Sequence, residues 1–317
     1  MSASPVLLGP TGGRTGRIAT RVFGWRSFLG RLVRRPEGAI GLAIIVFFAV
    51  LALAPSLFVG PLETVTSSSG KRLEPPSLRH LLGTDNLGRD VLNLTVHGAR
   101  ISMLIGLLAT VVTLAIGAVL GIVSGFVGGR TDTVIMRITD FFLVLPTFVL
   151  ALIIAPIVLD IIGTGEILGI RTTLFVIVIV IGITSWATTA RIIRSQTMSV
   201  KERAFIDRAR VIGSGPWRMM RVHILPNVTG LIVANAVLIF AGAILTETTL
   251  AFIGLGDPFA PSWGQILGSS QDAGAPGLGA WWWYVSPGVC IVLVVLAFTL
   301  IGGALDDLLN PKARRRR

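Results

Sequence analysis

Few side chains in this sequence could carry out catalysis or hold a metal ion. The three histidines, His80, His97 and His223, are far apart, and the sequence has neither an H-E-x-x-H motif nor a cluster of cysteine and histidine. Zinc sites need such ligands at short, fixed spacings. The single cysteine, Cys290, excludes an intramolecular disulfide. We therefore expect a chain that is not an enzyme and that binds no metal.

The sequence also lacks the motif that hydrolyses ATP in most ATP-driven machines. A phosphate-binding P-loop ends in Gly-Lys-Ser or Gly-Lys-Thr, because the lysine and the hydroxyl must reach phosphate and magnesium. The only Gly-Lys pair here is Gly70-Lys71, and Arg72 follows it. We expect no cofactor on this chain. If it works with ATP, then ATP and Mg²⁺ bind to a partner subunit.

The composition places the chain in a membrane. Of its 317 residues, 52% are hydrophobic and only 14% are charged, and the formal net charge is +12. A soluble protein usually carries about 25% charged residues, since its surface must face water. Positive charge beside long apolar runs orients helices in a bilayer, so we expect membrane lipid as a partner and no nucleic acid.

The apolar runs predict an all-α polytopic membrane protein with six transmembrane helices, since each exceeds the roughly 18 residues that a span needs. The expected spans are residues 39–62, 101–127, 139–159, 172–190, 228–253 and 282–305, the last five forming a core over residues 101–305. The other segments are a basic N-terminal segment (1–38), an external loop (63–100), a loop between the fourth and fifth spans (191–227) and a basic tail (306–317). Pro146 and Pro156 predict a kink in the third span.

The basic residues predict the orientation of these spans. With both termini on one side, that side holds 22 of the 28 Lys and Arg residues. The positive-inside rule then places both termini and the 191–227 loop in the cytoplasm. Residues 17–35 combine arginines with apolar residues at helical spacing, which predicts an amphipathic helix on the inner leaflet. A disordered basic tail that touches anionic lipid is the alternative.

One acidic residue, Glu247, lies inside an expected span. Such residues are costly in a membrane and often mark a substrate path. Glu247 is therefore a candidate for the translocation path, and a carboxylate that serves helix packing is the alternative. A secondary transporter would typically show several acids or bases in different spans, and Asp140 and Asp160 only bracket the third one.

The 191–227 loop has the most informative pattern. Phe205, Ala209 and Ile212 recur at positions i, i+4 and i+7, which predicts a short helix with one apolar stripe. A Gly-Ser-Gly-Pro run that begins at Gly213 ends this helix. In an aqueous loop the stripe must be buried, either on the protein's own spans or in the groove of a partner.

The same loop resembles a signature of the inner-membrane permease subunits of bacterial ATP-binding-cassette (ABC) importers. That signature reads Glu-Ala-Ala, three residues, Gly, nine residues and Ile-x-Leu-Pro. The positions that match its spacing are Asp207, Arg208, Ala209, Gly213, His223, Leu225 and Pro226. The sequence departs from the signature at Asp207, Arg208 and His223, and the His-Ile-Leu-Pro-Asn run is similar to the dipeptide and oligopeptide branch.

Further segments are similar to the C-type permease subunits of that branch. They are residues 82–92 with 98–102, 250–256, 261–264, 281–288 and 302–307, so the resemblance extends over about residues 30–312. It implies a type I importer permease fold and a non-catalytic subunit in the bacterial inner membrane. Its expected partners are a second homologous permease subunit, cytoplasmic ATPase subunits that bind ATP and Mg²⁺, and an external substrate-binding protein.

The resemblance also implies roles for the residues of the loop. Phe205, Asp207, Arg208, Ala209, Ile212 and Gly213 would form a coupling helix that sits in an ATPase groove, and Leu225 and Pro226 would fix the start of the fifth span. The implied substrates are dipeptides or oligopeptides. Similar permeases serve nickel complexes or glutathione, and a stand-alone secondary transporter or channel is the alternative from another class.

Two external segments complete the pattern. Asp85, Arg89 and Asp90 lie close together, which predicts a folded external cap with internal ion pairs. Residues 257–281 are rich in Gly, Pro and Trp and could dock a binding protein or form an external gate. The Trp run 281–283 predicts an interfacial tryptophan belt.

Overall fold

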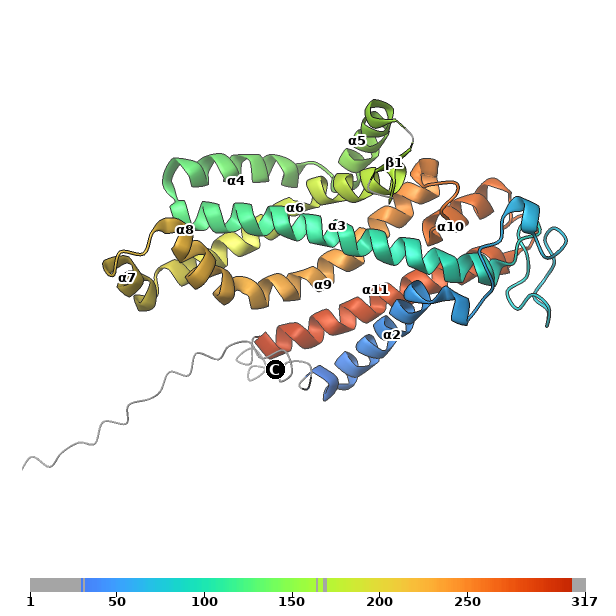
Figure 1. Ribbon diagram of the computed structural model, residues 1–317, viewed down its shortest axis with the longest axis horizontal. Coiled ribbons are helices and arrows are strands. Elements are labelled where there is room, and N and C mark those ends of the chain that lie inside the picture. The colour runs from blue at the N-terminus through green and yellow to red at the C-terminus, as the bar shows by residue number, and fades with distance from the viewer. Residues whose placement is uncertain (1–29, 31, 164, 168–169, 310–317) are drawn as a thin grey trace, which may run out of the picture.

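The computed structural model describes residue 30 and residues 32–163, 165–167 and 170–309, and most of them are helical. The long helices run along one common axis, with α7 and α8 at one end and the loops that precede α3 at the other (Figure 1). The main helices are α2 (Pro36–Leu53), α3 (Val91–Val127), α4 (Gly129–Val144), α5 (Thr147–Ile162), α6 (Thr172–Lys201), α9 (Leu225–Leu250) and α11 (Trp281–Leu309). Most of the predicted amphipathic segment 17–35 lies outside the described residues.

Shorter elements connect these helices. The helical ones are the single turns η1 (Pro55–Leu57) and η2 (Val65–Ser67), the helices α7 (Ala204–Val211), α8 (Pro216–Arg218) and α10 (Trp263–Asp272), and the π-helical segments η3 (Met219–Ile224) and η4 (Ala251–Leu255). The strands β1 (Glu166–Ile167) and β2 (Ile170–Arg171), of two residues each, pair in an antiparallel hairpin. The described parts of the two ends lie side by side, because Arg35 Nη1 and Asp307 Oδ2 form an ion pair of 2.6 Å.

Five helical stretches are each long and apolar enough to cross a membrane. They are α2, α3, α6, the continuous stretch Pro216–Leu255 and α11. The pair α4 and α5 supplies a sixth crossing when counted as one span. The structure thus confirms the predicted all-α polytopic fold, with five to six spans.

The third predicted span, 139–159, is not a straight helix. Helices α4 and α5 meet at an angle of 93°. Pro146 causes the break, because its ring disfavours a helical conformation in the preceding residue, and Leu145 is indeed extended with ψ 131°. Pro156, in contrast, lies inside α5.

Three other helix ends differ from the predicted boundaries. Helix α3 begins at Val91 rather than at 101, because the Asp90 side chain caps it by accepting from the backbone N–H groups of the second and third residues. Helix α6 continues past residue 190 to Lys201. Helix α2 ends at Leu53, two residues before Pro55, rather than at 62. Charged residues mark the part of a helix that leaves the bilayer, but the helix itself can continue beyond them. It ends where a capping side chain or a proline interrupts the backbone hydrogen bonds.

The centre of the bundle is the contact between α3 and α6, the most extensive one between any two helices. Three glycines of α3, Gly117, Gly121 and Gly125, are spaced by four residues and face α6. A Cβ atom at Gly121 would lie 2.6 Å from the carbonyl oxygen of Ala190, and one at Gly125 would lie 2.8 Å from that of Arg194. The two backbones therefore touch, which is how helices associate in lipid.

This contact is tested by Gly121→Ala. The added methyl group overlaps the backbone of α6, so we expect the free energy of unfolding to fall by about 1–3 kcal/mol. The matched control is Gly242→Ala, because an added Cβ there has no atom within 4 Å. Replacing glycine by alanine raises the helix propensity equally at both positions, so a difference between the variants reports the contact alone. Thermal unfolding of the detergent-purified chain measures the difference, and equal melting temperatures would contradict the close contact.

Candidate functional site: the loop before α9, the buried glutamate and the cap before α3

Helix α7, the predicted coupling helix, has one face buried against the rest of the chain. Its eight residues follow a break at Glu202 and Arg203, just past the end of α6. Ile206 is completely buried in an apolar cluster that includes Met219 and Ile224. Ala209 is buried as well. The helix is therefore fixed to the segment that leads into α9.

The exposed surface of α7 carries apolar side chains next to charged ones. Phe205 is 37% exposed, and Val211 and Ile212 are exposed by more than 80%. The predicted stripe is thus divided: Ala209 is buried, Ile212 is exposed, and Phe205 is partly exposed with its ring centroid 6.5 Å from that of His223. The reason is that Ile206 supplies the inward contact, while Ile212 already lies past the last residue of the helix. An aqueous loop that exposes such side chains has an unpartnered apolar surface.

Gly213 ends α7 with a backbone conformation that suits glycine. Its φ is +90°, a region that other residues avoid. The N–H of Gly213 donates to Arg210 O, and the N–H of Ser214 donates to Ala209 O. This pair of hydrogen bonds is a Schellman motif. It fixes the turn that follows α7.

The charged residues of α7 lie on its exposed side. Asp207 pairs with Arg210 at 3.2 Å, and both side chains are more than half exposed. Arg208 is exposed and forms no ion pair within the described part of the chain. A polar cavity of about 450 Å³ separates this helix from the ends of α3, α4 and α6, with Asp207 and Arg210 on one wall.

The chain then enters α9 without a break in the helix. Residues Pro216–Leu255 form one continuous helical stretch. The N–H of Leu225 donates to Met220 O, five residues earlier, which is the widened turn of a π-helix. Pro226 lies in the first turn of α9, directly after this widened turn. A movement of α7 would therefore pass directly to α9.

An ion pair that the sequence did not single out holds together the helix ends near α7. Arg194 of α6 binds Asp132 of α4 through two hydrogen bonds of 2.5 and 2.6 Å. Ser124 of α3 also donates to Asp132. Lys201 Nζ donates to Phe126 O at 2.6 Å. Asp132 and Arg194 are 62 residues apart, so only the three-dimensional structure could pair them.

Glu247 lies inside the packing of three helices. Its side chain is only 1% exposed. Ser102 Oγ of α3 donates to Glu247 Oε2 at 3.3 Å, and the backbone N–H of Trp263, the first residue of α10, donates to Ser102 Oγ at 3.1 Å. Among the described residues, Glu247 Oε1 has no hydrogen-bond partner. This environment fits the packing alternative, and a role in translocation stays a prediction.

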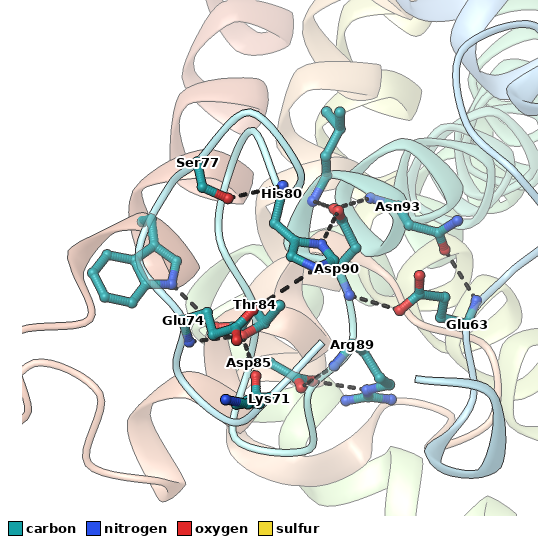
Figure 2. Close-up of polar contacts among 12 residues, drawn as sticks. Glu63, Lys71, Glu74, Ser77, His80, Thr84, Asp85, Arg89, Asp90 and Asn93 are labelled. Atoms are coloured by element: carbon teal, nitrogen blue, oxygen red, sulfur yellow. Dashed lines mark hydrogen bonds and ion pairs between the residues drawn. The ribbon is translucent and has the colours of Figure 1, made fainter. Parts of the chain in front are cut away.

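The external cap contains the ion pairs that the sequence predicted, and Figure 2 shows them. Asp85 is completely buried. It accepts from the backbone N–H groups of Leu87 and Arg89 and pairs with Arg89 Nε at 2.7 Å. A carboxylate with three donors is well satisfied despite its burial. The cap is thus a folded unit rather than a flexible loop.

The cap is joined to the first turn of α3. Besides capping the helix, Asp90 contacts His80 Nδ1 at 2.9 Å through Oδ2 (Figure 2). Glu63 Oε2 accepts from the backbone N–H of Asp90, and Asn93 Oδ1 accepts from that of Glu63. These bonds connect residues up to 30 positions apart, so the cap and the outer end of α3 form one structure.

The predicted tryptophan belt is wrong for two of its three members. Trp282 and Trp283 are buried, and Trp282 Nε1 donates to Thr84 O of the cap at 3.1 Å. Only Trp281 is exposed. The cap covers the other two, which a hydropathy pattern cannot show. Asp257, in the segment before α10, pairs with Arg171 at 3.3 Å.

Comparisons with known proteins assign the family. Residues 117–315 match the model of the binding-protein-dependent transport system inner membrane component. The chain belongs to this family. The resemblance noted in the sequence is therefore confirmed, and the chain is a non-catalytic permease subunit and an integral inner-membrane protein.

Individual relatives are similar over nearly their whole length. The permease is 37% identical to the di/tripeptide transport system permease protein DppC of Pseudomonas aeruginosa, over 92% of this chain and 91% of that protein. It is 35% identical to the dipeptide permease protein DppC of Bacillus subtilis, over 92% and 85%. The oligopeptide permease protein OppC of the same species is 33% identical, over 92% and 90%.

A solved structure supports the fold. An inward-facing form of the MetNI methionine ABC transporter matches with a TM-score of 0.52 and 18% identity, over 69% of this chain and 95% of that one. At this identity the match shows the ABC permease fold alone. Among the described residues of the permease, no group of three or more His, Cys, Asp or Glu side chains could hold a metal ion.

The cap is tested by Asp85→Ala. Three donors lose their acceptor, so we expect the free energy of unfolding to fall by about 2 kcal/mol. We also expect faster proteolysis within residues 63–90. The control is Asp272→Ala, which removes an exposed external acid instead. Indistinguishable melting temperatures and cleavage rates for the two variants would show that the buried pair does not hold the cap.

Proposed function

We propose that this permease is one of two membrane subunits of an ATP-driven importer for dipeptides or oligopeptides. The observation that carries the proposal is the 33–37% identity to relatives named for di/tripeptide, dipeptide and oligopeptide transport, over about nine-tenths of this chain. Permeases for nickel complexes or for glutathione are the alternatives within the family.

We further propose that both termini face the cytoplasm, as the 22 basic residues on that side suggest.

In this proposal α7 is the coupling helix. Phe205, Ile212 and the adjacent Val211 would enter a groove on a cytoplasmic ATPase subunit, since they form an exposed apolar surface. Asp207 and Arg208 would make polar contacts at the rim of that groove. ATP and Mg²⁺ would bind to the ATPase subunits and not to this chain.

The packing behind α7 supports a rigid transmission. When two ATPase subunits close, α7 would move as a body and press on Ile224 through Ile206, which are both fully buried. Leu225 and Pro226 would carry this movement into α9 through the continuous helix. Glu247 lies near the far end of α9, against α10, so the same helix reaches both sides of the membrane. Rigid-body motion of this kind is a common route to alternating access.

The proposal includes two further partners, a second permease subunit and a substrate-binding protein. A second homologous permease subunit would complete the translocation path. An external substrate-binding protein would dock on the cap and on the segment around α10. The rigid, ion-paired cap suits such docking, because a pre-organised surface loses little conformational entropy on binding.

The coupling role is tested by Ile212→Asp. Its side chain is 84% exposed, so the fold should be unchanged. A carboxylate in an apolar groove costs about 2 kcal/mol or more, and we expect at least a tenfold loss of affinity for the ATPase subunits. Co-purification with the ATPase subunits measures this loss of affinity, and transport-coupled ATP turnover measures its effect on coupling. Val65→Asp, on an exposed apolar residue of the external side, is the control. Equal association of both variants would exclude this surface as the contact.

The substrate class is tested in proteoliposomes that contain the permease with its partner subunits and binding protein. We expect ATP-dependent uptake of a labelled dipeptide or oligopeptide, because the relatives described above are named for the transport of such peptides. Uptake of glutathione or of a nickel complex, with no peptide uptake, would favour the alternatives within the family. The chain reconstituted alone is the control, and gradient-driven flux through it would support a secondary transporter or channel.

A further inference from the structure

An apolar groove opens at the cytoplasmic end of the bundle, away from the exposed side of α7. It has a volume of about 280 Å³ and lies between α3 and the turn that leads into α9. One wall consists of residues of α3, among them Ala118, Val119 and Ile122. The other wall includes Trp217 and Arg221. All its lining side chains except Arg221 are apolar.

The rim of this groove is basic and aromatic. Trp217 is 70% exposed, which is unusual for so large a side chain unless something covers it. Arg218 and Arg221 are three residues apart on the same helical turn, so they project to one side. Within the described part of the chain, neither forms an ion pair. The groove therefore has apolar walls, Arg221 is the one charged residue that lines it, and Arg218 lies three positions before Arg221 in the sequence.

We propose that this groove binds an anionic phospholipid of the inner leaflet. Acyl chains match its apolar walls, and arginine binds phosphate through paired hydrogen bonds. Basic pockets between spanning helices on the cytoplasmic side are typical sites for anionic head groups. Tryptophan favours the level where head groups and acyl chains meet, which is the position of Trp217 here.

The position along α3 agrees with this assignment. Val119 lies eight residues before the last residue of α3, which is about 12 Å along the helix axis. A lipid whose phosphate sits near Arg221 would place its first methylene groups beside Val119. The assignment to the inner leaflet rests on the orientation proposed above.

The chemistry of the walls disfavours a peptide as the occupant. A bound peptide needs partners for its backbone N–H and C=O groups, because unpaired polar groups are costly to bury. The lining residues offer only the guanidinium of Arg221 and the indole N–H of Trp217. An acyl chain needs no such partners. A partner protein could also cover the groove, and the experiment separates that case.

The test uses the permease assembled with its partner subunits in phosphatidylcholine nanodiscs. Brominated phosphatidylglycerol or brominated phosphatidylcholine is added, and the fluorescence of Trp217 is obtained by subtracting the signal of a Trp217→Phe variant. We expect Trp217 to be quenched by the brominated anionic lipid at a low mole fraction. Arg221→Gln should weaken the apparent affinity about fivefold, which corresponds to the ~1 kcal/mol that one basic residue contributes near an anionic surface.

Two further variants serve as controls. Arg137→Gln removes an exposed arginine of α4 that does not line the groove, and it should leave the affinity unchanged. Val119→Phe fills the groove at an exposed position and should abolish the quenching of Trp217 by either lipid. Melting temperatures of both variants near that of the unaltered permease show that the fold is intact.

Three results would overturn the proposal. Equal quenching by the two lipids would mean that the head group is not selected. Equal effects of Arg137→Gln and Arg221→Gln would mean that only the overall charge matters. A Trp217 that neither lipid quenches would mean that a protein partner covers the groove. Because the readout needs neither substrate nor ATP, it is independent of whether the permease carries peptides.

Discussion

The direct contact between the backbones of α3 and α6 is the interaction on which the rest of the structure depends. In lipid, apolar side chains gain little by leaving their surroundings, so helices associate through close packing and hydrogen bonds. The four-residue spacing of Gly117, Gly121 and Gly125 lets α3 approach α6 to the distance that a Cβ atom would forbid. Helix α3 also contacts α2, α4, α9, α10 and α11, so its position fixes the position of nearly every other helix.

Polar interactions then hold α3 at its two ends rather than in its middle. At the N-terminal end of α3 Asp90 joins the helix to the cap, and near its C-terminal end Ser124 joins it to the Asp132–Arg194 pair. This distribution follows from the cost of burying charge, which is highest at the centre of the bilayer. Glu247 is the exception among the described residues of α9, and its contact with Ser102 links the outer halves of α9 and α3. Apolar packing fixes the middle of the bundle, and polar contacts fix which loops lie at each end.

Hydropathy, the loop signature and the further segments similar to C-type permeases were enough to predict the fold class and the family, because all of them are local patterns in the sequence. The break at Pro146 was expected only as a kink, since proline predicts a disturbance but not its 93° angle. The start of α3 was placed ten residues too late because Arg100 was taken as the end of a span, although a helix can continue into water. The pairing of Asp132 with Arg194 and the burial of Trp282 could not be predicted, because they depend on which distant segments meet.

The division of the stripe on α7 has a mechanical meaning. A helix that buried Phe205, Ala209 and Ile212 together could face either the chain or a partner, but not both. Ile206 and Ala209 bind α7 to the rest of the permease, while Phe205, Val211 and Ile212 stay exposed. Such a helix can receive a force on one side and deliver it on the other. The Schellman turn at Gly213 and the continuous helix from Pro216 limit the loss of that movement in the intervening loop. A transmitting element needs two faces and stiff connections, and the structure of this short loop contains both.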